Sequence, residues 1–240
     1  METNHISYNI DKSATRIDDI LNASNSGFEE LDEIPSRDKL TFTNGFYIKV
    51  GALFVDIRDS SDLTDEHKRP TLAKLYRSYI SEVVAIINSY EDCKEINIVG
   101  DCVSAIFNAK YQSQIQSMFN CSARINSLIQ ILNYKLQKKN IQTISIGMGL
   151  AYGRTLMIKA GCSGSSINDV VWMGDVVNEA SNLCNRANKG LNKCILVDGD
   201  VRCNLTDDDK KLLSYNYNEQ CYEGNFVNSA MEEWYKQNCK

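Results

Sequence analysis

Two aspartates stand where their carboxylates could do chemistry together. Asp56 comes near the end of the apolar stretch 45–57, and Asp101 lies between the two short apolar runs of 95–107. If these segments are neighbouring strands, both carboxylates reach the same edge of a sheet. Mg²⁺ prefers oxygen ligands and keeps coordination positions open for phosphate oxygens, so the pair suits Mg²⁺ or Mn²⁺ held against substrate phosphates. Each aspartate alone is also an ordinary turn residue.

The histidines and cysteines of the chain give little support for zinc binding, disulfide formation or nucleophilic catalysis. The only histidines are His5 and His67, and none of the nine cysteines forms a C-x-x-C pair. A structural zinc site or a disulfide framework would need tighter, paired spacing, and a nucleophile activated by histidine has no well-placed base. We therefore expect reduced thiols that mostly fill the core.

Composition places the chain among soluble globular proteins. Of 240 residues, 43% are hydrophobic and 24% charged, and the net charge of −5 comes entirely from residues 1–44. No basic surface for nucleic acid is indicated. Apolar runs such as 52–55 fall far short of the roughly 18–20 residues of a bilayer span, and no signal peptide precedes them. We expect a cytoplasmic protein without a membrane or nucleic-acid partner.

The elements that must position the aspartates alternate between strand and helix. Apolar runs predict a strand over 45–57, a hairpin over 95–107 with a tight turn at its tip, and strands over 141–152, 170–173 and 194–197. Helical spacing predicts helices over 64–89, 113–138 and 175–189. The pattern indicates an α/β fold with a mixed sheet and helices packed on it.

The remaining segments are weaker in pattern. The polar stretch 153–168 reads as a loop or projecting arm, and a short helix near 207–213 is followed by two weak strands around 215 and 221–227. Residues 1–44 contain a helix over 11–21 and then a turn-rich break. We expect 1–44 to be an acidic N-terminal extension and 45–240 to be one catalytic domain.

Four ordered blocks resemble the catalytic domain of class III nucleotidyl cyclases. They are LFVDIRDSSDLT (53–64), INIVGDCVSAIF (96–107), ISIGMGLAYG (144–153) and VVWMGDVVNEASNL (170–183). The corresponding family patterns are F-x-D-I-x-G-F-T, a G-D hairpin, I-G-x-x-x-G and G-D-x-V-N-x-A-S-R-L. Each block alone is weak, but their order over most of 46–200 makes the resemblance specific.

The resemblance implies a ferredoxin-like α+β domain, with a mostly antiparallel sheet, that works as a head-to-tail homodimer with shared active sites. It implies that Asp56, Asp101 and the Ile57 carbonyl hold two divalent cations, Mg²⁺ or Mn²⁺. The backbone amides of Asp59, Ser60 and Ser61 would hold phosphate oxygens. It further implies that Asn178 of the partner subunit orients the ribose.

Two departures from the family pattern concern catalysis and base recognition. The family arginine falls four residues after Asn178, where this chain has Asn182, and Arg186 lies one turn further along the same helix face. Purine cyclases place Lys or Glu where this chain has Asn97, and Asp or Cys where it has Val171. An uncharged amide that both donates and accepts suits a pyrimidine edge better than either purine pattern.

These features together resemble the pyrimidine cyclases of the bacterial Pycsar antiphage system. That resemblance implies cyclic UMP or cyclic CMP made from UTP or CTP, and a separate effector that reads the product. Tyr47, near the start of the first strand, is a candidate to narrow the base pocket, although an aromatic strand residue is more often core. A purine cyclase and a catalytically inactive nucleotide-binding sensor stay open as alternatives. A palm-type polymerase or diguanylate cyclase would want a G-G-D/E-E-F hairpin or a nucleic-acid channel, and neither is visible.

Overall fold

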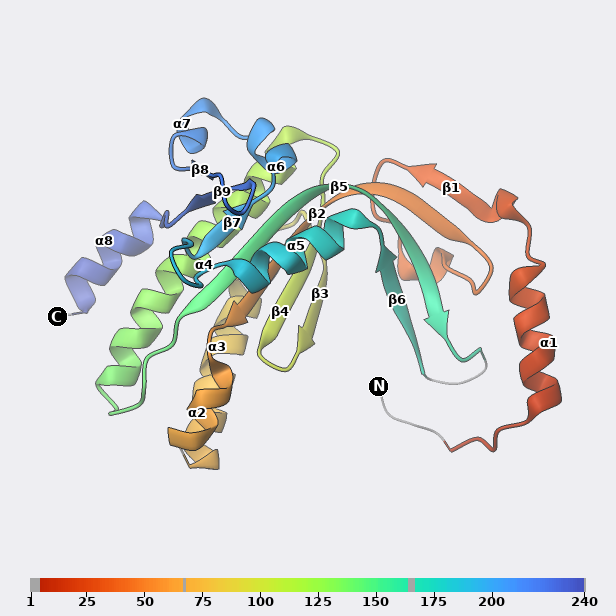
Figure 1. Ribbon diagram of the computed structural model, residues 1–240, viewed down its shortest axis with the longest axis horizontal. Coiled ribbons are helices and arrows are strands. Elements are labelled where there is room, and N and C mark those ends of the chain that lie inside the picture. The colour runs from red at the N-terminus through yellow and green to blue at the C-terminus, as the bar shows by residue number, and fades with distance from the viewer. Residues whose placement is uncertain (1–4, 67, 164–166, 240) are drawn as a thin grey trace. The chain divides into compact units, whose positions relative to one another are not determined.

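The computed structural model describes residues 5–66, 68–163 and 167–239 (Figure 1). Its helices are α1 (Ile10–Leu21), α2 (Ser60–Glu66), α3 (Arg69–Asn88), α4 (Gln112–Gln137), α5 (Asp175–Arg186), α6 (Gly199–Cys203), α7 (Asp207–Lys210) and α8 (Ser229–Asn238). Its strands are β1 (Phe28–Leu31), β2 (Gly45–Ile57), β3 (Cys93–Val99), β4 (Cys102–Asn108), β5 (Ile146–Gly161), β6 (Asn168–Met173), β7 (Ile195–Val197), β8 (Ser214–Asn216) and β9 (Cys221–Gly224). Two 3₁₀ turns, Asn25–Gly27 and Arg37–Lys39, flank β1.

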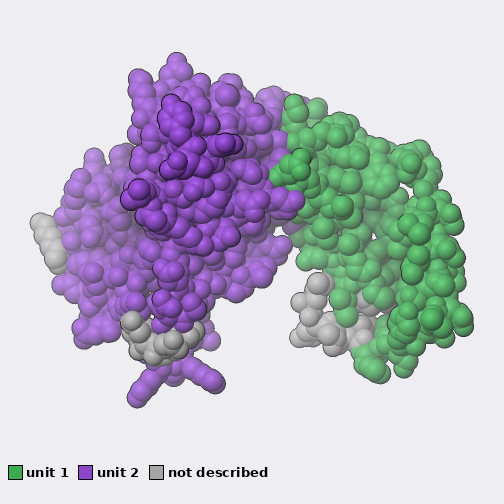
Figure 2. Space-filling model, in the orientation of Figure 1, with its two compact units in different colours: residues 1–49, 154–175 green, residues 50–153, 176–240 purple. Residues whose placement is uncertain are grey.

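The chain divides into two compact units, which Figure 2 colours separately. Unit 1 comprises residues 1–49 and 154–175, and unit 2 comprises 50–153 and 176–240. Strands β2 and β5 each begin in one unit and end in the other. The predicted boundary between an extension of 1–44 and a domain of 45–240 stays a prediction, although β2 does begin at Gly45.

Unit 2 contains the main sheet and its core. The strand order is β3-β4-β2-β5-β7-β9-β8. β4 runs antiparallel to both β3 and β2, β9 runs antiparallel to both β7 and β8, and β5 pairs in parallel with β7. Helices α3 and α4 pack on each other and on β3 and β4, and Tyr79, Phe107 and Phe119 are among the largest fully buried side chains. The fold is therefore α+β, with a mixed, mostly antiparallel sheet, as predicted.

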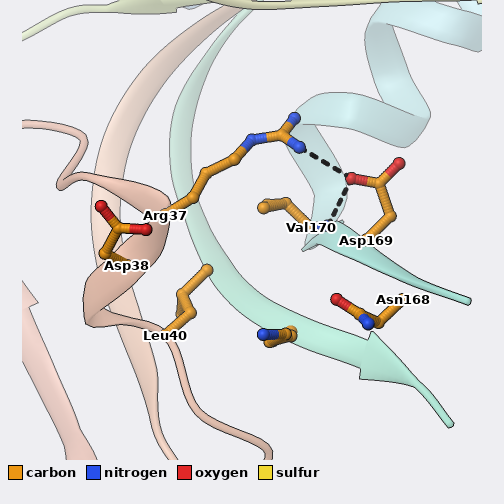
Figure 3. A pocket seen from close by; sticks show the side chains of 7 residues that line it. Arg37, Asp38, Leu40, Asn168, Asp169 and Val170 are labelled. Carbon is orange, nitrogen blue, oxygen red and sulfur yellow. Dashed lines mark hydrogen bonds and ion pairs between the residues drawn. The ribbon is translucent and has the colours of Figure 1, made fainter. Parts of the chain in front are cut away.

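Unit 1 is built from the ends of the two long strands. β1 pairs in parallel with the start of β2, and β6 pairs antiparallel with the end of β5. Arg37 forms an ion pair with Asp169 at 3.0 Å, beside a polar pocket of about 290 Å³ (Figure 3). Lys159, which also lines this pocket, lies with its ammonium 5.2 Å from the Phe42 ring centre. The Arg37–Asp169 ion pair is exposed to solvent and therefore contributes little stability, whereas Met157 of the same unit is fully buried.

Several predicted elements were wrong in their bounds. One helix was expected over 64–89, but the structure has two. Helix α2 starts at Ser60, and α3 starts at Arg69. Pro70 lies in the first turn of α3, where the missing N–H of proline loses no helical hydrogen bond. The strand expected to stop at 152 runs on to Gly161, so the arm is the β5–β6 hairpin rather than a loop. β1, α6 and α8 had no counterpart among the predictions.

The nine cysteines are all free thiols, as expected, and Cys121, Cys184 and Cys221 are buried. The other six are exposed or only partly buried, so fewer of them fill the core than the composition suggested. No helix in the described ranges has both the length and the apolar character needed to cross a membrane.

Candidate active site

Strand register brings Asp56 and Asp101 together in unit 2. Asp56 is the last residue but one of β2, and Val55 pairs with Val103 of β4, so Asp56 lies across from Cys102 and beside Asp101. Asp101 sits at the tip of the β3–β4 hairpin, where Gly100 takes a φ of +65° that glycine adopts without strain. The alternation along β2 and the tight hairpin turn therefore place both carboxylates at one sheet edge.

The electrostatics of this pair suit a divalent cation. Burial raises the pKa of Asp56, the neighbouring Asp101 carboxylate raises it further, and Arg58 opposes both effects. The Asp101 Oδ2 atom is buried and has no hydrogen-bond partner within the described ranges. A buried, unsatisfied carboxylate oxygen is costly unless something cationic or protic reaches it. Bound Mg²⁺ or Mn²⁺ would relieve both the repulsion and the missing contact.

No cluster of three or more His, Cys, Asp or Glu side chains with metal-binding geometry occurs among the residues that the structure describes. Two carboxylates leave several positions around a hard cation to be filled by backbone carbonyls, water or phosphate oxygens. Ile57 follows Asp56 directly, is almost fully buried and closes β2, which puts its carbonyl next to the pair. The donor set fits a cation bound together with a phosphate-bearing substrate.

Arg58 is a buried cation that the sequence patterns did not reveal. Its Nη2 donates to Asp56 Oδ2 at 2.7 Å, and its Nη1 donates to the carbonyl of Asn185 in α5 at 3.1 Å. The Arg58 side chain is only 4% exposed. Because a planar guanidinium bonds in fixed directions, Arg58 fixes the orientation of the Asp56 carboxylate and ties the end of β2 to α5.

A tyrosine and a cysteine lie near enough to the two carboxylates to feel their charge. Burial raises the pKa of Tyr79 well above its usual value, and nearby Asp56 adds to the effect. Burial together with the two carboxylates raises the pKa of Cys102 to about 11. Both groups therefore stay protonated near neutral pH and provide neither a nucleophile nor a base. Helical spacing marked Tyr79 as core, but its nearness to the carboxylates depends on the tertiary fold.

The turn after β2 brings Asp59, Ser60 and Ser61 next to the carboxylates. Asp59 adopts a φ of +53° at the position where the family pattern has glycine. Its carbonyl accepts a hydrogen bond from the Asp62 amide at 3.0 Å, at the start of α2. The Ser60 hydroxyl hydrogen-bonds the phenol of Tyr76. Burial raises the pKa of this phenol, and the nearby Asp101 carboxylate raises it further. These contacts order a short turn beside the two carboxylates.

Helix α5 carries Asn178 on an exposed face. Val176, Ala180, Leu183 and Cys184 face inward, and Gly149 of β5 lets the helix approach so closely that an added Cβ would collide with the Ala180 carbonyl. Asn178 and Asn182 are left exposed to solvent. Asn97 is also exposed, on β3, where it pairs in register with Ser104.

Arg186 is engaged within its own chain. Its Nη1 donates to the Glu219 carboxylate at 2.9 Å and to the Glu219 carbonyl at 3.1 Å, and its Nε donates to the Asn182 carbonyl at 3.3 Å. These bonds anchor the end of α5 to the β8–β9 turn. To reach a phosphate, the guanidinium would have to leave Glu219.

Two other residues that the sequence analysis linked to base recognition, Tyr47 and Val171, belong to unit 1. Tyr47 is half-buried on β2, and the Arg154 guanidinium lies 3.8 Å from the centre of its ring. Arg154 is held in turn by Glu30, whose carboxylate accepts from its Nη2 at 2.7 Å. Val171 of β6 is 39% exposed. One face of Tyr47 is thus covered within unit 1.

Comparison with known proteins identifies the relatives of this chain. It is 43% identical to the uridylate cyclase of Gulbenkiania mobilis, over 99% of this chain and all of that protein. It is 38% identical to the uridylate cyclase of Treponema porcinum, over 95% of this chain and 80% of that protein.

Among solved structures, the adenylyl cyclase CyaB from P. aeruginosa matches with a TM-score of 0.62 at 20% identity, over 71% of this chain and 85% of that one. The guanylyl cyclase Cya2 matches with a TM-score of 0.61 at 15% identity, over 72% of this chain and 83% of that one. These likenesses show a shared fold. The family model described as "Adenylate and Guanylate cyclase catalytic domain" matches residues 44–224, and the chain therefore belongs to this family of nucleotidyl cyclase domains.

Proposed function

We propose that this chain is a uridylate cyclase, which converts UTP to 3′,5′-cyclic UMP and pyrophosphate. The observation that carries the proposal is its similarity, over almost its whole length, to the uridylate cyclase of Gulbenkiania mobilis. The paired carboxylates of Asp56 and Asp101 support the chemistry, because they form an acidic edge suited to a cation bound with a triphosphate. CTP is the second candidate substrate.

In this proposal each residue of the site has a defined task. Two cations, Mg²⁺ or Mn²⁺, would be held by Asp56, Asp101 and the Ile57 carbonyl, and would supply charge neutralisation of the triphosphate and a lower pKa of the ribose 3′-hydroxyl. Amides of Asp59, Ser60 and Ser61 bind phosphate oxygens beside them. Arg186 would stabilise the leaving pyrophosphate only after its guanidinium had broken its hydrogen bonds to Glu219 and turned to the phosphate oxygens.

Base recognition is assigned to Asn97 and Tyr47. The Asn97 amide offers one donor and one acceptor edge, which matches the hydrogen-bonding edge of a pyrimidine. Tyr47 would limit the depth of the pocket, so that a purine does not fit. The resemblance to Pycsar cyclases extends the proposal to cytoplasmic antiphage signalling, in which a separate effector binds the cyclic nucleotide.

One observation favours a second candidate, an inactive nucleotide-binding sensor. Asn182 stands where the family has its arginine, and the nearest replacement, Arg186, is already bonded to Glu219. A sensor would keep the acidic edge and bind a nucleotide without turning it over.

Incubation of the purified protein with each of the four nucleoside triphosphates and Mn²⁺, followed by mass identification of products, tests the proposal. We expect cyclic UMP as the main product. Cyclic AMP or cyclic GMP as the main product would identify a purine cyclase. Nucleotide binding without any cyclic product would identify the sensor.

We also expect active sites shared between two copies of the chain. Asp56→Ala and Asn178→Ala would then damage complementary halves of each site, so the two inactive variants should regain activity when mixed. Heterodimers contain one site with both lesions and one with neither, so half of their sites should work. The measurement is cyclic UMP formation after subunit exchange has been verified by native mass spectrometry. A mixture that exchanges subunits and stays inactive would contradict the shared site.

A further inference from the structure

A large groove runs between helices α3 and α4, within unit 2. It encloses about 1,050 Å³, on a scale that accommodates a sizeable ligand or a helix face. Its apolar lining consists of Leu75, Leu128, Ile131, Leu132, Leu136 and Ile141. The metal-site carboxylates and the base-pocket positions do not line it, so the proposed cyclase chemistry does not use it.

Lysines surround this apolar floor. Lys68 and Lys74 belong to the α3 side, and Lys135 and Lys139 to the α4 side. All four are exposed, and within the described ranges none of them takes part in an ion pair. Glu82 is the one acidic side chain in the described lining. The groove therefore favours an occupant that is apolar along its centre and acidic at its edges.

Helix α1 of unit 1 has this pattern. Ile10, Ile17 and Leu21 lie on one face of the helix and are 71%, 53% and 77% exposed. None of the twelve residues of α1 is buried. A helix this short is marginal in water by itself and normally gains its stability by packing an amphipathic face. Among the described residues, no side chain buries the apolar face of α1.

The charges of α1 complement those of the groove. Asp11 and Asp18 are seven residues apart, so they lie two turns apart along one edge of the apolar face. The segment 1–44 as a whole holds nine acidic and four basic residues and accounts for the net charge of the chain. Packing the apolar face on the floor of the groove would bring this acidic edge to the lysines.

We propose that α1 of one copy of this chain docks in the α3–α4 groove of a second copy. The contact buries two unpartnered apolar surfaces against each other and pairs Asp11 and Asp18 with lysines at the rim. It gives the N-terminal segment an assembly role that does not depend on cyclase chemistry, so loss of the proposed activity would leave it standing.

Zero-length carbodiimide crosslinking of mixed ¹⁴N and ¹⁵N full-length chains tests the contact. Exchange is first verified by native mass spectrometry of mixed-label oligomers. We expect crosslinks between Asp11 or Asp18 of one label and Lys68, Lys74, Lys135 or Lys139 of the other. A matched charge swap gives the control: Lys74→Glu with Lys135→Glu should reduce these crosslinks at least about fivefold, and adding Asp11→Lys with Asp18→Lys should restore links of the opposite polarity.

Four results would overturn the proposal. Crosslinks found only within one label would place α1 on its own chain. Links confined to two α1 segments would indicate a helix pair instead. Chains that remain monomeric at every concentration, or crosslinks unaffected by the charge swap, would show that the groove is not the docking surface. Asp19→Asn, on the polar side of α1, is the variant expected to leave the crosslinks unchanged.

Discussion

Replacing Asp56 or Asp101 with alanine is expected to abolish nucleotide cyclisation. Each change removes one of the two carboxylates that meet at the sheet edge, and with it a proposed ligand of the cations that neutralise the triphosphate. The rate at saturating Mn²⁺ should fall well below a tenth of that of the unmodified protein. A smaller loss would correspond to less than ~1.4 kcal/mol of barrier and would contradict the metal assignment.

The two alanine variants should differ in stability. Asp56→Ala leaves the buried Arg58 guanidinium without its 2.7 Å partner. Breaking a fully buried pair costs about 3–5 kcal/mol, and less here because the Asp56 side chain is one-third exposed. Asp101→Ala removes a carboxylate that repels Asp56 and whose Oδ2 has no hydrogen-bond partner within the described ranges, so this variant should unfold near the temperature of the unmodified protein. Asp56→Asn, which keeps an acceptor for Arg58, separates loss of metal binding from loss of folding.

Binding of Mn²⁺ gives a readout that does not depend on turnover. Electron paramagnetic resonance should show weaker Mn²⁺ binding in Asp56→Asn and Asp101→Ala. Asp207→Ala, which changes a carboxylate that is 94% exposed in α7, is the matched control and should bind and react normally. If Asp101→Ala binds Mn²⁺ as well as the control does, the acidic edge is not the metal site.

The strands that carry the carboxylates could be predicted from local signals. β-Branched and aromatic residues with an apolar run toward the end defined β2 to the residue, and the Gly100-Asp101 turn between two apolar runs defined the β3–β4 hairpin. The pairing of β2 with β4 joins segments far apart in sequence and had to be assumed, and with that assumption Asp56 and Asp101 reach one edge. The strands of the arm were not predicted because polar residues and glycines surround the short apolar run 156–158, and pairing with β6 extends β5 through them.

Arg58 and Arg186 illustrate what local signals cannot predict. A charged residue directly after a strand, such as Arg58, is normally expected to be exposed. Arg58 is instead buried, and one of its hydrogen-bond partners is Asn185, 127 residues further along the chain. Arg186 reads as a free cation on a helix face, yet Glu219, 33 residues later, holds it. Partners so distant in sequence follow only from the register of the sheet and the packing of α5.

The second large effect that we expect concerns the base. A site that hydrogen-bonds one base edge rejects an analogue that leaves its buried groups unpaired, by factors that reach ~10⁴, whereas an apolar pocket discriminates by only about 10–200-fold. Asn97 is exposed on β3 in the single chain, so its amide is available to a nucleotide, and in the proposed shared site a bound base would bury it. The protein should therefore convert UTP or CTP and discriminate steeply against ATP and GTP.

Asn97→Ala should lower the selectivity between UTP and CTP more than it lowers Mn²⁺ affinity, because the proposal assigns the base to this amide and the cation to the two carboxylates. Ser104→Ala, which changes the residue that pairs with Asn97 across the hairpin, is the matched control and should keep the selectivity. The measurement is the ratio of cyclic products in a four-way competition. If ATP is the best substrate there, Asn97 does not read the base, and the pyrimidine assignment and the antiphage role inferred with it both fall.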